Sequence, residues 1–229
     1  MFIVEDDPRS IVSESYKILR TNIQYSSFDK KIRSIVVTSA GAGEGKSMTA
    51  CNLALSFAQE NKKVILIDCD LRRPSIHRKF KISNNLGLSD ILVESLRKED
   101  AIYKYNENLS IITSGHIPPN PSEMLGSNQI ANLIENLKED YDMVMLDSAP
   151  LRAVTDAQLL SIKTDGTILV VEAEKTKKED IIYAKELLVK VDANILGLVL
   201  NKSKSKDKKY YYYYGENGNE KKKRARKFL

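Results

Sequence analysis

A short glycine-rich segment, residues 40–47, has the residue types that bind phosphate groups. It reads AGAGEGKS and stands between an apolar run at 35–37 and a helical pattern at 48–59. Between a strand and a helix, such glycines let backbone N–H groups turn toward phosphate oxygens, and the helix points its positive N-terminus at them. The spacing therefore predicts a phosphate-binding loop, in which Ala40 replaces the usual first glycine.

Two side chains at the end of this loop have the chemistry to act on a nucleotide. The Lys46 ammonium would bridge the β- and γ-phosphates, and the Ser47 hydroxyl would ligate Mg²⁺. The alternative is an ordinary glycine-rich turn with a chance Lys-Ser pair. The predicted nucleotide-binding residues of the segment are Gly41, Ala42, Gly43, Glu44, Gly45, Lys46, Ser47 and Met48.

Two further apolar runs end in aspartates. Asp68 and Asp70 follow the run 64–67 at a spacing that puts both carboxylates on one side of an extended strand end, and Asp147 follows the run 143–146. A lone aspartate is more often a cap or turn residue. Mg²⁺ prefers few carboxylates together with water and phosphate oxygens. Beside a phosphate loop, these aspartates predict a Mg²⁺ site, with ligands Ser47, Asp70 and Asp147.

The chain alternates short apolar runs with helical patterns. Such alternation predicts an α/β fold of the P-loop NTPase class, a mostly parallel β-sheet flanked by helices on both faces. Residues 1–9 look irregular, and Ser122 is expected to cap a short helix. The apolar runs are 35–37, 64–67, 109–112, 143–146, 168–171 and 195–200, and the helical patterns are 11–26, 48–59, 129–138, 153–161 and 179–191.

Composition narrows the class of protein. The 229 residues fit one domain. No apolar run reaches the ~20 residues of a membrane span, and the N-terminus lacks a signal-peptide pattern. Cys51 and Cys69 fall in predicted core segments, which indicates buried thiols in a reducing compartment rather than a disulfide framework. These features predict a cytoplasmic protein.

Residues 202–229 differ in composition from residues 1–201, so we expect a folded domain followed by a mobile tail. The tail has eleven Lys and Arg against three acids, a net charge of +8, which leaves −3 of the total +5 for residues 1–201. A mildly acidic body argues against a nucleic-acid-binding face. The tail also contains five consecutive tyrosines. We expect them to be phosphate acceptors; the alternative is an arm that packs against a neighbouring subunit. The five are Tyr210, Tyr211, Tyr212, Tyr213 and Tyr214.

Together these motifs resemble the bacterial tyrosine kinases (BY-kinases) of capsule and exopolysaccharide synthesis, in the free-standing form typical of Gram-positive bacteria. The resemblance covers essentially the whole chain. It implies ATP and Mg²⁺ as cofactors, and transfer of phosphate to the tail tyrosines of a neighbouring subunit. By resemblance, Asp68 accepts or orients the tyrosine proton, and Lys46 and Arg72 are catalytic. Asn201 and Lys202 directly follow the last apolar run, and from that position they are expected to border the adenine. The carrying motifs are 40–47, 68–72, 147–150, 118–121 and the tyrosine cluster.

The same family has an N-terminal Glu-x-x-Arg-x-x-Arg helix that builds a ring of subunits. Here Glu14, Lys17 and Arg20 occupy those positions, and lysine replaces the first arginine. The resemblance implies a homo-oligomeric ring, a transmembrane polysaccharide co-polymerase that activates the kinase and recruits it to the inner face of the cell membrane, and a cognate tyrosine phosphatase. Taken alone, Glu14 and Lys17 are explained equally well by an intrahelical pair.

Two other functions stay open on the sequence. An ATPase switch of the partition or septum-positioning type shares the loop and the aspartates, but it has a lysine where this chain has Gly41. It also gives no reason for the tyrosine cluster. The third hypothesis is a nucleotide-bound scaffold for polysaccharide assembly that turns over no ATP.

Overall fold

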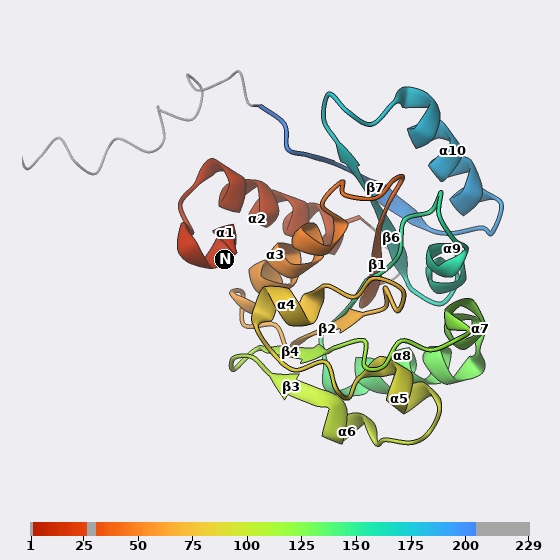
Figure 1. Ribbon diagram of the computed structural model, residues 1–229. Coiled ribbons are helices and arrows are strands. Elements are labelled where there is room, and N and C mark those ends of the chain that lie inside the picture. The colour runs from red at the N-terminus through yellow and green to blue at the C-terminus, as the bar shows by residue number, and fades with distance from the viewer. Residues whose placement is uncertain (1, 27–30, 205–229) are drawn as a thin grey trace, which may run out of the picture.

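A mostly parallel β-sheet organises the chain (Figure 1). The computed structural model describes residues 2–26 and 31–204, and in these residues the sheet has seven strands in the order β3-β4-β2-β5-β1-β6-β7. Each neighbouring pair is parallel except β3 with β4. The strands are β1 Ser34–Ser39, β2 Val64–Asp68, β3 Ile102–Lys104, β4 Leu109–Ile112, β5 Met143–Asp147, β6 Gly166–Glu172 and β7 Ile195–Asn201.

Helices cover both faces of this sheet. One face packs against α3, with α1, α2 and α4 beside it, and the other packs against α5, α7, α8, α9 and α10. The predicted fold class is therefore confirmed. The helices are α1 Ile3–Asp6, α2 Ile11–Gln24, α3 Lys46–Ala58, α4 Ile76–Phe80, α5 Leu88–Leu92, α6 Lys98–Ala101, α7 Pro121–Gly126, α8 Asn128–Asp140, α9 Asp156–Ser161 and α10 Lys178–Val189.

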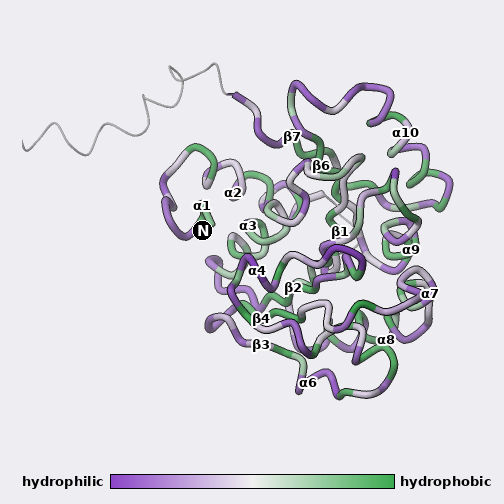
Figure 2. The backbone as a smooth tube through the Cα atoms, viewed as in Figure 1, coloured by the Kyte–Doolittle hydropathy of each residue, from purple (hydrophilic) through white to green (hydrophobic). Residues whose placement is uncertain are grey.

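The alternating directions of the side chains along β1 show why both faces of the sheet must be covered by helices. Ile35 and Val37 join the hydrophobic core under α3, whereas Val36 joins the core under α8. Successive side chains of a strand point to opposite faces, so a strand that is apolar throughout must be covered twice. Figure 2 shows hydrophobic colours along much of β2 and β4 and hydrophilic colours along many of the connecting loops.

Three local expectations are corrected by the structure. Residues 3–6, expected to be irregular, form the one-turn helix α1 because Val4 is buried in the core under α3. The edge strand β3 was not predicted, since its three residues are too few to show a period. Helix α7 begins at Pro121, so Ser122 lies inside it and does not cap it.

The predicted boundary between domain and tail, at residues 201 and 202, lies close to the end of the described residues. Residues 205–229, including the tyrosines 210–214, lie outside the described residues, so the mobile tail stays a prediction. Among the residues that are described, no helix combines the length and hydropathy of a membrane span.

The predicted ring-forming residues lie on α2, next to α3. The Lys17 ammonium is 2.7 Å from Glu14 Oε1, which is the intrahelical pair of the alternative interpretation. Arg20 makes its contacts within the chain: Nη1 donates to the Ser56 carbonyl oxygen at 2.7 Å, and Nη2 lies 3.1 Å from Glu60 Oε1. The Arg20 side chain is only 13% exposed. It therefore joins α2 to the last turn of α3.

We predict that Arg20→Ala lowers the free energy of unfolding by about 1–2 kcal/mol, because a mostly buried, charge-assisted hydrogen bond is lost. Lys17→Ala is the matched control on the same helix, and should cost only about 0.3–0.5 kcal/mol. Urea unfolding at two protein concentrations measures both. Equal losses for the two variants would contradict a structural role for Arg20. Glu14, which lacks such a contact to α3, is the better residue for testing the ring.

Candidate functional site

The predicted phosphate loop joins β1 to α3 at the carboxyl edge of the sheet. Gly43 and Gly45 adopt φ angles of 80° and 98°, in the region that favours glycine. A Cβ added at Gly45 would stand 2.0 Å from Nδ2 of Asn201, so the close approach excludes a side chain as well. Helix α3 begins at Lys46, directly behind the loop. The local sequence thus places a helix start directly behind a glycine loop, which is the geometry that the predicted phosphate site requires.

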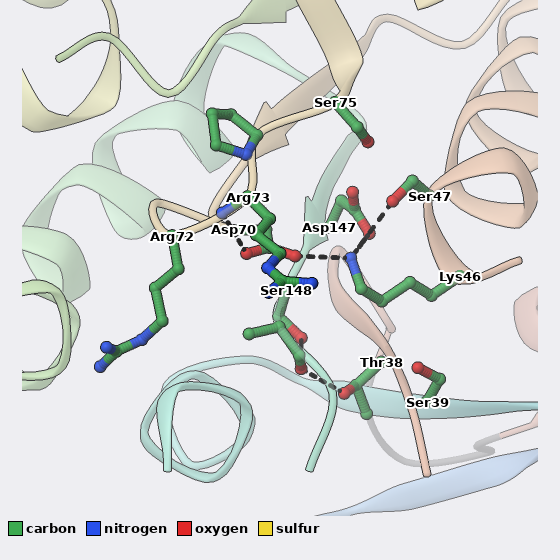
Figure 3. Close-up of polar contacts among 12 residues, drawn as sticks. Thr38, Ser39, Lys46, Ser47, Asp70, Arg72, Arg73, Ser75, Asp147 and Ser148 are labelled. Carbon is green, nitrogen blue, oxygen red and sulfur yellow. Dashed lines mark hydrogen bonds and ion pairs between the residues drawn. The ribbon is translucent and has the colours of Figure 1, made fainter. Parts of the chain in front are cut away.

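Lys46 lies where the loop meets the ends of β2 and β5 (Figure 3). Its Nζ is 2.9 Å from Asp70 Oδ2, 3.4 Å from Asp147 Oδ1 and 3.2 Å from Ser47 Oγ. Burial lowers the pKa of Lys46, but the charges of Asp147 and Asp70 outweigh it and hold that pKa above its usual value. The ammonium thus neutralises two carboxylates that are almost fully buried.

The same cluster fits the donor set of a magnesium ion. Asp147 Oδ2 is buried without a hydrogen-bond partner in the part of the chain that is described. An orphaned carboxylate oxygen, a second carboxylate and a serine hydroxyl are hard oxygen ligands, so Ser47, Asp70 and Asp147 would hold Mg²⁺. Within residues 2–26 and 31–204, no three acidic, His or Cys side chains converge as a complete metal site. Phosphate oxygens and water would supply the remaining ligands.

Unlike Asp70 and Asp147, which contact Lys46, Asp68 is held by backbone N–H groups. Its Oδ2 accepts hydrogen bonds from the N–H groups of Ser75 and Ile76, both at 2.9 Å, and its Oδ1 accepts one from the Asp70 N–H at 3.3 Å. Burial and the charge of Asp147 raise the pKa of Asp68 to about 7 despite these bonds. Asp68 thus shapes the turn that presents Asp70, and it stands opposite Asp147 across the paired strands β2 and β5.

Arg72 points away from Lys46 and does not join the cluster (Figure 3). Its Nε donates to Asp156 Oδ2 at 3.0 Å, and its Nη2 donates to Ser122 Oγ at 2.8 Å. Ser122 in turn donates to Asp156 Oδ1 at 2.7 Å. Asp156 is fully buried in the first turn of α9. Arg72 therefore connects the turn after β2 to α7 and α9, through two partners that no sequence motif identified.

The other predicted nucleotide-binding residues fall into two groups. Ala42 and Gly43 of the loop, and Met48 just after it, are exposed. The side chains of Glu44 and Asn201 instead make hydrogen bonds to the backbone of the loop. Glu44 Oε2 accepts a hydrogen bond from the Gly41 N–H at 2.9 Å, and Asn201 Nδ2 donates to the Glu44 carbonyl oxygen at 2.9 Å. The predicted acceptors, tyrosines 210–214, are outside the described residues.

Comparison with known proteins gives close similarity to tyrosine kinases. Tyrosine-protein kinase YwqD of Bacillus subtilis (strain 168) is 44% identical over 203 residues, which are 88% of this chain and 86% of that protein. Putative tyrosine-protein kinase CapB of Staphylococcus aureus is 39% identical over 200 residues, covering 87% and 88%. The crystal structure of the chimerical protein CapA2B2 has a TM-score of 0.85 and 40% identity, covering 89% and 90%.

A septum site-determining protein shares the fold at lower similarity. The septum site-determining protein MinD of Pyrococcus horikoshii OT3, solved with Mg-ADP, has 26% identity and a TM-score of 0.62, covering 73% of this chain and 69% of that one. Residues 32–195 match the family described as AAA domain. The fold is thus common to both classes, and the higher identity over most of the chain separates them: this chain belongs to the bacterial tyrosine-protein kinases.

Proposed function

We propose that this kinase transfers the γ-phosphoryl group of ATP to the tail tyrosines of a neighbouring copy, and that it regulates capsule or exopolysaccharide synthesis and export. The observation that carries the proposal is the Lys46 ammonium held between Asp70 and Asp147 at a phosphate loop. Similarity to the capsule-type kinases supports the pathway. No observation favours the ATPase switch or the inert scaffold over the kinase.

The residues around the loop divide the work of phosphoryl transfer. Lys46 and the loop N–H groups would contact the β- and γ-phosphates and stabilise their negative charge, while Ser47, Asp70 and Asp147 would hold Mg²⁺. Bound there, Mg²⁺ would neutralise phosphate oxygens as charge moves to the leaving group. The chain's own contribution is a largely buried set of charges that the fold gathers at the loop before the substrates bind, with Lys46 paired to Asp70 and Asp147 until a phosphate replaces them.

Asp68 is the proposed acceptor of the tyrosine proton. A tyrosine hydroxyl has a pKa of about 10, so at neutral pH it needs a base as it attacks. The pKa of Asp68, raised to about 7 by burial and by Asp147, is near the value at which a base is most effective.

Arg72 is proposed as a positioning residue rather than a catalytic one. Its guanidinium is held by Asp156 and Ser122, on the side of the turn opposite Lys46. The turn from Asp68 to Arg72 is then fixed at both ends: by backbone N–H groups on the Asp68 carboxylate, and by Asp156 on Arg72. This arrangement would keep the Asp70 carboxylate in reach of Lys46.

A double-mutant cycle distinguishes the two roles. Arg72→Gln and Asp156→Asn should each lower kcat by about tenfold, and the double variant should be no worse than either alone, because both break one connection. Arg97→Gln, which disrupts an exposed pair with Asp100, is the control and should leave kcat unchanged. Autophosphorylation under saturating MgATP gives kcat. Additive losses would mean that Arg72 acts on the substrate itself.

The assembly around this kinase is also proposed from the family. We infer a ring of subunits, a transmembrane co-polymerase that activates the kinase and brings it to the inner face of the membrane, and a tyrosine phosphatase that resets the tail. The absence of a candidate membrane span in the described residues is compatible with attachment through such a partner. A nucleic-acid partner is not proposed.

A mixed-subunit assay tests transfer between subunits. One subunit has Lys46→Met and intact tyrosines, and the other is active but has phenylalanine at positions 210–214. We expect phosphotyrosine on the Lys46→Met subunit in the mixture, detected by mass spectrometry, and none when that subunit is incubated alone, because Lys46→Met removes the charge that stabilises the transferred group. Circular dichroism checks that Lys46→Met is folded. An unlabelled Lys46→Met subunit in the mixture, under conditions in which the wild-type chain labels itself, would contradict transfer in trans.

A further inference from the structure

The side chains of Glu44 and Thr176 connect the phosphate loop to the segment after β6. Glu44 is only 7% exposed, and its Oε1 accepts a 2.6 Å hydrogen bond from the Thr176 hydroxyl. The same hydroxyl accepts a hydrogen bond from the Glu172 N–H at 2.9 Å. The other carboxylate oxygen of Glu44, Oε2, accepts a hydrogen bond from the Gly41 N–H. The loop is therefore tied through Glu44 and Thr176 to the backbone at the end of β6.

A second connection runs from the end of β7 to the loop carbonyls. Lys202 Nζ donates to the Gly43 carbonyl oxygen at 3.0 Å and lies 2.9 Å from Glu172 Oε2. Beside it, Asn201 donates to the Glu44 carbonyl oxygen. Glu172 thus meets both connections, with its N–H on Thr176 and its carboxylate on Lys202. We call Thr176, Asn201, Lys202 and Glu172 the loop clamp.

Peptide geometry shows what the loop clamp does for a bound phosphate. In a planar trans peptide, the carbonyl oxygen of one residue and the N–H of the next point in opposite directions. With the Gly43 and Glu44 carbonyl oxygens held by Lys202 and Asn201, the N–H groups of Glu44 and Gly45 point away from the clamp. These are groups of the type that cradles phosphate in such loops. Holding the carbonyls therefore fixes the direction of the phosphate-binding N–H groups.

We propose that Thr176 and Lys202 are positioning residues of the phosphate loop, and that Lys202 makes the first residue of the tyrosine-bearing tail a part of the nucleotide site. The inference rests on the assignment of the 40–47 loop to nucleotide binding. It assigns no contact with the substrate to either residue, because both reach the loop from outside, at a side chain and at a carbonyl oxygen. The loop should thus be ordered before the nucleotide arrives.

Hydrogen exchange on the nucleotide-free, full-length chain tests this order directly. Thr176→Val keeps the shape of the side chain and removes its hydroxyl, whereas Thr176→Ser keeps the hydroxyl. We expect faster amide exchange in residues 41–47 for Thr176→Val, and exchange close to wild type for Thr176→Ser. Calorimetry with MgADP should show affinity weakened about five- to tenfold for Thr176→Val, as the loss of a partly buried hydrogen bond to a carboxylate implies, and rescued in Thr176→Ser.

Lys202→Gln gives an independent arm with a matched control. Lys202 is 48% exposed, so its replacement should not prevent folding, and we expect the same direction of change in exchange and in MgADP affinity. Lys204→Gln removes the same charge two residues further on, where the side chain is 86% exposed and 4.0 Å from Glu174. That control should match wild type in both measurements.

Each outcome bears on the proposal. Unchanged loop exchange in both Thr176→Val and Lys202→Gln would overturn it. So would weakened MgADP affinity without any change in exchange, since these residues would then act on the ligand and not on the loop. If the exchange and affinity results are as expected but the wild-type chain forms no phosphotyrosine with MgATP, the loop clamp stands and the proposed autokinase function fails.

Discussion

The pairing of the Lys46 ammonium with the buried carboxylates of Asp70 and Asp147 is the interaction on which the site depends. Two carboxylates at the buried edge of a sheet are costly without a cation, because burial penalises each charge and they repel each other. Parallel pairing of β2 with β5, which sets Asp68 opposite Asp147, fixes the positions of the acids. The start of α3 places Lys46 between Asp70 and Asp147. The fold therefore assembles a charged site around one lysine.

Support for this pairing comes from two sides of the loop. On one side, Arg72 ties the turn that presents Asp70 to the buried Asp156. On the other, the loop clamp holds the carbonyl oxygens of the phosphate loop through Asn201 and Lys202. Neither support touches Lys46, yet each fixes a segment that must stay in place for the phosphates to bind. The loop behind Lys46 and the turn that carries Asp70 are thus positioned by hydrogen bonds from elements that are distant in the sequence.

Local patterns predicted the parts of the site that follow strands. The loop at 40–47 and the aspartates at 68, 70 and 147 could be found because apolar runs and glycine spacing are local signals. The partners of Arg72 and Glu44 could not: Asp156 lies 84 positions from Arg72, and Thr176 lies 132 positions from Glu44. No local sequence pattern around a single Asp or Thr predicts a contact with a residue so far along the chain. Arg20 shows the same limit, since its contact with Ser56 spans 36 positions and no local pattern indicated it.

The magnesium dependence of ADP binding tests the central pairing most directly. A nucleotide phosphate must draw Lys46 away from Asp70 and Asp147, and without Mg²⁺ these buried carboxylates would be left without a cation. Calorimetry should therefore show ADP binding to the wild-type chain weakened by at least about tenfold when Mg²⁺ is removed with a chelator, as one unpaired buried charge already implies. In Asp147→Asn, the dependence on Mg²⁺ should be clearly smaller. Equal ADP affinity with and without Mg²⁺ in the wild-type chain would contradict the account.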